Sequence, residues 1–115
     1  MPVWLPLLLA GEGLLIALLG IPLLRRKVKP NRLYGFRTPK TLGNETIWYE
    51  ANAYAGRLMC IVGLVMAALD VVLWLLIRTG TLCLHKDGLA LLLLAIAVIP
   101  LLVLVTLAFL YLRKL

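Results

Sequence analysis

Residues 56–74 read GRLMCIVGLVMAALDVVLW, an apolar stretch in which certain residues recur at alternating spacings of four and three. These spacings place the recurring residues on one face of a helix. The residues on this face are Gly56, Cys60, Gly63, Ala67, Asp70 and Trp74. Small residues on one face let a second helix approach closely, which is how helices associate in lipid. The stretch therefore predicts a membrane-spanning helix with a helical partner.

The first apolar run, residues 3–24, is the predicted partner because it carries small residues of its own. These are Ala10, Gly13, Ala17 and Gly20. The third run, residues 88–112, has no comparable face, and its Leu, Ile and Val side chains surround most of the helix. We therefore expect the third span to be the most exposed to lipid, with Pro100 able to kink it.

The composition agrees with a membrane protein. Of the 115 residues, 63% are hydrophobic and 15% are charged, whereas soluble domains typically contain about 45–50% and about 25%. Three spans of about 20 residues occupy roughly half of such a chain, which excludes a large catalytic domain outside the membrane. We predict an all-α integral membrane protein, a three-transmembrane-helix bundle that forms one domain over residues 1–115. Its spans cover 3–24, 57–77 and 88–112, and an ordered basic loop with the start of the second helix covers 25–56.

The positions of the basic residues predict the orientation, because Lys and Arg near the spans stay on the cytoplasmic side. The first loop and the C-terminus, which share one side of a three-span protein, carry ten of them, against two on the other side. The ten are Arg25, Arg26, Lys27, Lys29, Arg32, Arg37, Lys40, Arg57, Arg113 and Lys114, and the two are Arg78 and Lys86. We expect the N-terminus outside, and the first loop and the C-terminus in the cytosol. The net charge of +7 then reflects topology and lipid headgroups, and not nucleic-acid binding.

The polar segment 29–52, KPNRLYGFRTPKTLGNETIWYEAN, is the candidate binding region. Pro30 and Pro39 restrict the backbone and Gly35 can supply a turn, so we expect an ordered loop. Asn44 is a suitable N-cap for the second helix, and Glu45 in the first turn favours the helix dipole. We expect that helix to begin there and to run from the membrane surface into the bilayer.

Two interpretations of the polar side chains in this segment remain open. In the first, they satisfy one another and fasten the loop to the base of the helix. In the second, they form a recognition surface or a headgroup or anion site. We expect Arg37 to anchor the loop through a charge-assisted contact with Glu45, Glu50 or an Asn side chain near Asn52. Trp48 lies on an apolar strip of the helix outside the membrane and is suited to the membrane interface.

The same segment closely resembles the signature region of the SdpI family, bacterial membrane proteins named for immunity to a sporulation-delaying peptide toxin. The resemblance is carried by residues 28–32, 34–39, 41–42, 44–45, Trp48, 51–52 and Gly56. With the adjacent spans it covers the first two thirds of the chain. It implies a bacterial inner-membrane protein that protects against a secreted toxin and, in the founding system, binds a cytosolic autorepressor. The founding type is longer, with an additional membrane half before the signature, so the resemblance supports the fold more directly than the function.

Within this signature, the candidate binding residues are Asn31, Arg32, Tyr34, Arg37, Thr38, Asn44, Glu45, Trp48 and Asn52. Through them we expect the protein to bind a peptide toxin or a cytosolic regulator, in immunity or signalling of the SdpI type. The lipid bilayer is a further partner. A homo-oligomer is expected because a small-residue face can also serve a second copy, and no cofactor is expected.

Two acids inside the spans support a rival function, since an ionisable residue within a span is a functional hypothesis by default. Glu12 and Asp70 lie about 13 Å and about 10 Å from the outer ends of their spans, so they can meet. Two carboxyl groups that share a low-dielectric site do not both ionise easily, so one of them keeps its proton near neutral pH. This property suits a proton relay or a cation site of a small transporter. The structural alternative is a polar contact between helices. Glu12 lies beside the small-residue face and not on it.

The remaining reactive side chains carry weaker signals. Cys60 belongs to the small-residue face near the cytosolic end of its span, whereas Cys83 lies on the outer loop, so we expect no disulfide between them. Cys83 with His85 and Asp87 matches no established metal geometry, which favours a solvated loop over a metal site. No nucleophile elbow, phosphate loop or dinucleotide fingerprint occurs in the sequence, which favours a non-enzymatic role.

Overall fold

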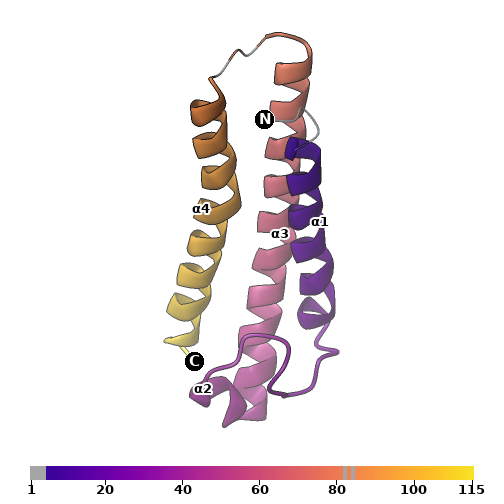
Figure 1. Ribbon diagram of the computed structural model, residues 1–115. Coiled ribbons are helices and arrows are strands. Elements are labelled where there is room, and N and C mark those ends of the chain that lie inside the picture. Colours follow the sequence, from indigo (N-terminus) through magenta and orange to yellow (C-terminus); the bar gives the residue numbers. More distant parts are fainter. Residues whose placement is uncertain (1–4, 82, 84) are drawn as a thin grey trace.

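The computed structural model describes residues 5–81, 83 and 85–115, and this part of the chain is helical (Figure 1). Its elements are α1 (Leu5–Leu24), α2 (Pro39–Leu42), α3 (Glu45–Arg78) and α4 (Lys86–Leu112). Helices α1, α3 and α4 are each long and apolar enough to cross a membrane. This confirms the predicted all-α, three-span membrane fold. The first two residues of the predicted first span, 3 and 4, lie outside the described residues.

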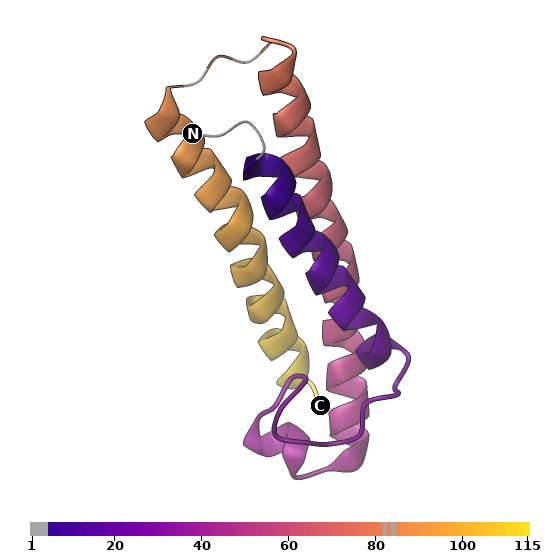
Figure 2. The same ribbon diagram turned by 45° about the vertical axis from the view of Figure 1, so that its right-hand side comes forward.

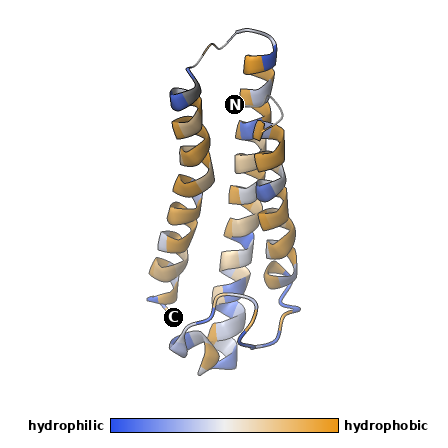
Figure 3. Cartoon of the chain, viewed as in Figure 1, coloured by the Kyte–Doolittle hydropathy of each residue, from blue (hydrophilic) through white to orange (hydrophobic). Residues whose placement is uncertain are grey.

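Hydropathy divides the molecule along its length (Figure 3). Apolar residues cover the three long helices, while hydrophilic residues gather where the chain turns at either end. We term the end formed by residues 25–44, the first turns of α3 and the C-terminus the loop end, because residues 25–44 fold over it (Figure 1). This end carries ten Lys and Arg residues and two acids, Glu45 and Glu50.

Helices α1 and α3 run antiparallel and side by side (Figures 1 and 2). The small residues predicted on α1 are all buried against α3. A Cβ atom placed on Gly20 would lie 2.5 Å from the carbonyl oxygen of Gly56, and one placed on Gly56 would lie 2.5 Å from the carbonyl oxygen of Gly20. The two backbones therefore touch, which confirms the predicted direct packing. Both small-residue faces are used within one chain, so they add no support for a second copy.

Helix α4 packs against α3 but covers it less completely. At the end opposite the loop, Leu73 of α3 and two leucines of α4, Leu89 and Leu93, form an apolar cluster that the first turns of α1 join. Most other aliphatic side chains of α4 are exposed, and it is the least buried of the three spans. The predicted lipid exposure of the third span is confirmed. Pro100 lies inside α4, which is helical on both sides of it.

The short helix α2 was not predicted, although a signal for it stands in the sequence. Thr38 caps the helix, because its hydroxyl accepts a hydrogen bond from the Thr41 N–H at 3.1 Å. The Thr41 hydroxyl accepts in return from the Thr38 N–H at 2.7 Å. Pro39 occupies the first helical position, where its missing N–H costs nothing. A Thr-Pro pair followed by Thr41 thus encodes a reciprocal cap.

We expect Gly20→Ala to weaken the packing of α1 on α3, because overpacking at a backbone contact costs about 1–3 kcal/mol. Thermal unfolding in detergent should show a lower midpoint for this variant. The matched control is Gly11→Ala on the same helix, where a Cβ would meet nothing within 4 Å, and its midpoint should equal or exceed that of the wild type. Equal midpoints for the two variants would contradict the close approach of the helices.

Candidate functional site

The loop is fastened to α3 by the side chain of Asn52, which is 2% exposed. Its Oδ1 accepts a hydrogen bond from the Phe36 N–H at 2.5 Å, and its Nδ2 donates to the carbonyl oxygens of Phe36 and Trp48 at 3.3 and 2.9 Å. Gly35, the residue before Phe36, has a φ of +113°. A Cβ there would lie 2.8 Å from the Asn52 Oδ1, so both conformation and space require glycine.

Trp48 lies one turn before Asn52 and is fully buried beneath the loop. Its indole Nε1 donates a hydrogen bond to the carbonyl oxygen of Val28 at 2.9 Å. The expectation that Trp48 occupies the membrane interface is therefore wrong. The physical reason is that the loop backbone supplies the acceptor that the indole N–H would otherwise find among lipid headgroups.

Three further candidate residues stabilise the backbone around them. Asn31 Oδ1 accepts from the N–H groups of Leu33 and Tyr34 at 2.9 and 2.7 Å. Thr38 caps α2, and Asn44 caps α3 by accepting from the Ile47 N–H at 3.1 Å, as predicted. These contacts agree with the first interpretation, in which the polar side chains of the segment form hydrogen bonds within the loop and with the base of the helix.

Arg37 does not make the predicted contact with α3. Its guanidinium donates to the carbonyl oxygen of Arg32, within the loop, while Glu50 forms an ion pair with Arg26 at 3.1 Å. The turn at Gly35 directs Arg37 back toward its own loop, which is why the carboxylates of α3 are not its partners. Arg32, Arg37 and Glu45 are exposed. The loop therefore presents charged groups that its own fold leaves accessible.

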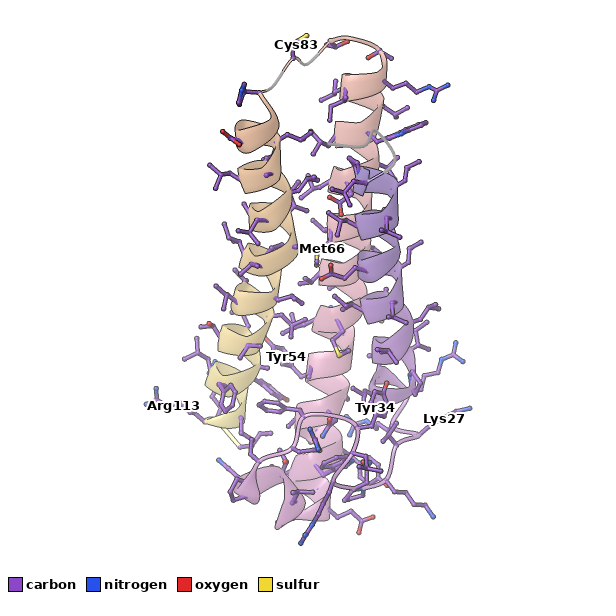
Figure 4. All side chains as sticks on the ribbon, viewed as in Figure 1. Lys27, Tyr34, Tyr54, Met66, Cys83 and Arg113 are labelled. Carbon is purple, nitrogen blue, oxygen red and sulfur yellow. The ribbon has the colours of Figure 1, made fainter. Side chains whose placement is uncertain are left out.

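Tyr34 joins the loop to α1, because its hydroxyl donates to the carbonyl oxygen of Leu19. Figure 4 shows its side chain at the loop end of α1. Burial raises the pKa of the Tyr34 hydroxyl above its ordinary range. The hydroxyl consequently keeps its proton and remains a hydrogen-bond donor.

Two aromatic contacts and one lysine join the loop end to α4. The rings of Phe36 and Phe109 meet edge to face at 5.0 Å, and those of Tyr54 and Tyr111 stack at 4.1 Å. Figure 4 shows Tyr54 between α3 and α4. Lys40 Nζ donates to the carbonyl oxygen of Leu112 at 2.9 Å, where the last carbonyls of α4 favour a cation.

An apolar pocket of about 330 Å³ lies beneath the loop. All three long helices and the loop segment 34–36 contribute to it. Its walls include Leu19 and Leu23 of α1, Tyr34 and Phe36 of the loop, Met59 of α3, and Leu104 of α4. Sequence reasoning did not find this pocket, because its walls come from four segments whose apolar residues look like ordinary span residues.

The two intramembrane acids lie along the contact between α1 and α3. Asp70 is 2% exposed, and its Oδ1 has no hydrogen-bond partner among the described residues. Glu12 is half-buried. Asp70 thus lies inside the contact between α1 and α3, and Glu12 lies at its edge.

The remaining candidates are Cys60, beside Ala17 of α1, and three residues at the end opposite the loop, Cys83, His85 and Asp87. Cys60 and Cys83 are free thiols. His85 Nδ1 and Asp87 Oδ2 lie 3.6 Å apart and both side chains are exposed. Within the described residues, no three side chains of His, Cys, Asp or Glu gather closely enough to hold a metal.

Three spans and a polar loop locked onto the longest helix define a helical membrane protein with one ordered, basic end. A family model shows which group of such proteins this is. The model of the SdpI/YfhL protein family matches residues 27–111, and the chain belongs to that family. The match includes the loop, α3 and α4 and begins after α1, so it reaches further toward the C-terminus than the expected two thirds of the chain.

The uncharacterized protein YfhL of Bacillus subtilis (strain 168) is a curated relative. It is 40% identical over 43 residues, which cover 37% of this chain and 39% of YfhL. This chain therefore matches less than half the length of that relative. No solved structure matches the chain.

We expect Asn52→Ala to release the loop, because the Phe36 N–H would lose its acceptor, while the Phe36 C=O would keep only the Thr41 hydroxyl as its donor. A buried group left unsatisfied costs about 1–3 kcal/mol. Limited trypsin digestion in detergent should cut the loop at Arg32, Arg37 or Lys40 at least about tenfold faster than in the wild type. The control is Glu45→Ala, an exposed position on the same helix, which should be cut at the wild-type rate. Unchanged digestion of Asn52→Ala would refute the anchoring role.

Proposed function

We propose that the protein is a membrane interaction protein of the SdpI type. It binds a membrane-active peptide or a cytosolic regulator through the signature loop, in immunity or signalling. One observation carries the proposal: Leu33, at the tip of the loop, is 92% exposed, although the residues around it are ordered. Arg32, also exposed, adds a cation beside this apolar side chain.

The ordering of the tip supports this function. Asn31 holds the backbone N–H of Leu33 itself, and Asn52 and Trp48 hold the loop on either side of the tip. A surface that is ordered before binding loses little conformational entropy when a partner arrives. An exposed apolar side chain with a neighbouring arginine on such a surface suits a binding anchor.

We further propose that the loop end faces the cytosol of a bacterial inner membrane. The charge bias of ten basic residues against two supports this orientation, and family membership supports the bacterial membrane. A secreted peptide would then meet the loop end from within the bilayer, whereas a regulator would meet it from the cytosol.

Survival of bacteria challenged with a panel of secreted, membrane-active peptides tests the interaction function. We expect the wild type to raise survival and Leu33→Ser to lose most of the protection at equal protein level, because the anchor is removed from an exposed position. Leu42→Ser, another exposed leucine of the loop end, should protect like the wild type.

Two controls accompany this assay. A photo-crosslinking residue at position 33, compared with position 42, detects a cytosolic partner where no peptide is involved. If the loop end is cytosolic, an impermeant thiol reagent should label the wild type at Cys83 in intact cells but should not label the Cys83→Ser/Lys29→Cys variant. Absence of protection against every peptide, together with absence of a crosslink specific to position 33, would overturn the proposed function.

A second candidate function is a small proton- or cation-coupled transporter. The observation that favours it is the buried Asp70, whose Oδ1 has no partner among the described residues. A polar atom left unsatisfied in a membrane span is costly and is typically retained for function. Glu12 supplies the second acid.

Proteoliposomes containing a pH-sensitive dye test this candidate. If the acids form a proton or cation path, Asp70→Asn should abolish a flux that the wild type supports, with an unchanged unfolding midpoint. Glu12→Gln should reduce the flux less, because Glu12 lies at the edge of the contact. Wild-type flux no greater than that of protein-free liposomes would remove the transporter function and leave the interaction function in place.

A further inference from the structure

The apolar pocket beneath the loop opens sideways toward lipid. Leu19 of α1 and Val105 of α4 both line it, and they are 43% and 48% exposed. They therefore stand at the mouth, between two helices that each pack on α3. An apolar cavity of about 150 Å³ already holds a benzene ring. A pocket of about 330 Å³ that opens to the bilayer accommodates a longer stretch of hydrocarbon.

Two arginines stand at the loop side of this pocket. The lining segment 34–36 runs between Arg32 and Arg37, and the bond from the Arg37 guanidinium to the Arg32 carbonyl closes the loop around that segment. Both side chains are exposed. Among the described residues, neither guanidinium pairs with a carboxylate. Most of their N–H donors are consequently available to an anion.

The excess of basic residues around the pocket favours an anionic lipid over a neutral one. The loop end carries ten basic residues and two acids, and Arg26 with Glu50 is its ion pair in the described part of the chain. A neutral lipid would leave this excess uncompensated, whereas a phosphate with net negative charge matches it. Paired guanidiniums also suit the planar, bidentate recognition of phosphate oxygens.

We propose that the pocket holds one acyl chain of an anionic phospholipid from the surrounding bilayer, with its phosphate bound by Arg32 and Arg37. Tyr34 and Phe36 separate the two parts of this site. Their rings line the apolar pocket, while the arginines beside them in sequence face the headgroup. The site shares Arg32 with the proposed partner surface but does not use Leu33, so variants that fill the pocket test lipid binding separately from partner binding.

Native mass spectrometry of the protein released from nanodiscs with equal phosphatidylglycerol and phosphatidylethanolamine tests the site. We expect one retained phosphatidylglycerol, at least tenfold in excess over phosphatidylethanolamine. Val105→Trp, which fills the pocket from its mouth, should abolish retention. The matched control is Val98→Trp, on an exposed position of the same helix outside the pocket, and it should retain lipid like the wild type.

The headgroup contact is tested with Arg32→Gln/Arg37→Gln against Lys27→Gln/Lys29→Gln, which lowers the charge of the loop end equally. Only the arginine pair should lose the preference for phosphatidylglycerol. Equal effects of the two pairs, equal retention of the two lipids by the wild type, or equal retention by Val105→Trp and Val98→Trp would each overturn the proposal. So would release of the wild-type protein with no lipid bound.

Discussion

The loop end depends on one amide side chain. Asn52 offers a donor and an acceptor to the N–H and C=O of the same residue, Phe36, so the loop is held at its middle and not only at its ends. Because α3 is a continuous helix, this contact fixes the loop relative to the spans. The ring of Phe36 then reaches α4 through Phe109, and Tyr34 reaches α1. All three spans are thereby tied together at this end by a segment that crosses none of the membrane.

What the sequence predicted well was periodic or local. The small residues of α1 and α3 repeat with the helical period, and their contact follows from geometry that holds for any pair of helices. The caps of Asn44 and Thr38 involve residues three apart, yet only the cap at Asn44 was predicted. The partners of Arg37 and Trp48 were mistaken, because they are loop carbonyls whose positions depend on the path of the backbone around Gly35. Every residue has a backbone carbonyl, so the sequence does not show which one acts as an acceptor. Arg37 was therefore assigned to side chains of the second helix and Trp48 to the membrane interface.

The polar side chains of the loop and those of the spans differ in how completely they are hydrogen-bonded. In the loop, Asn31, Thr41 and Asn52 each make several hydrogen bonds with the backbone, and such a network resists rearrangement. In the span, Asp70 keeps an oxygen without a partner among the described residues. The loop is built to hold its shape and to present its exposed side chains, whereas the span retains a group with unused bonding capacity. This contrast is why the two candidate functions belong to different parts of the chain.

Helix α3 is longer than a membrane requires. Its 34 residues extend about 51 Å at 1.5 Å per residue, while a hydrocarbon core is about 30 Å thick. The first turns of α3 therefore extend beyond the hydrocarbon core, and the loop packs on these turns. Spans answer a change of bilayer thickness by changing their tilt, and tilting a long rod sweeps its protruding tip sideways. A change of tilt that follows a change of bilayer thickness would therefore move the loop sideways along the membrane surface.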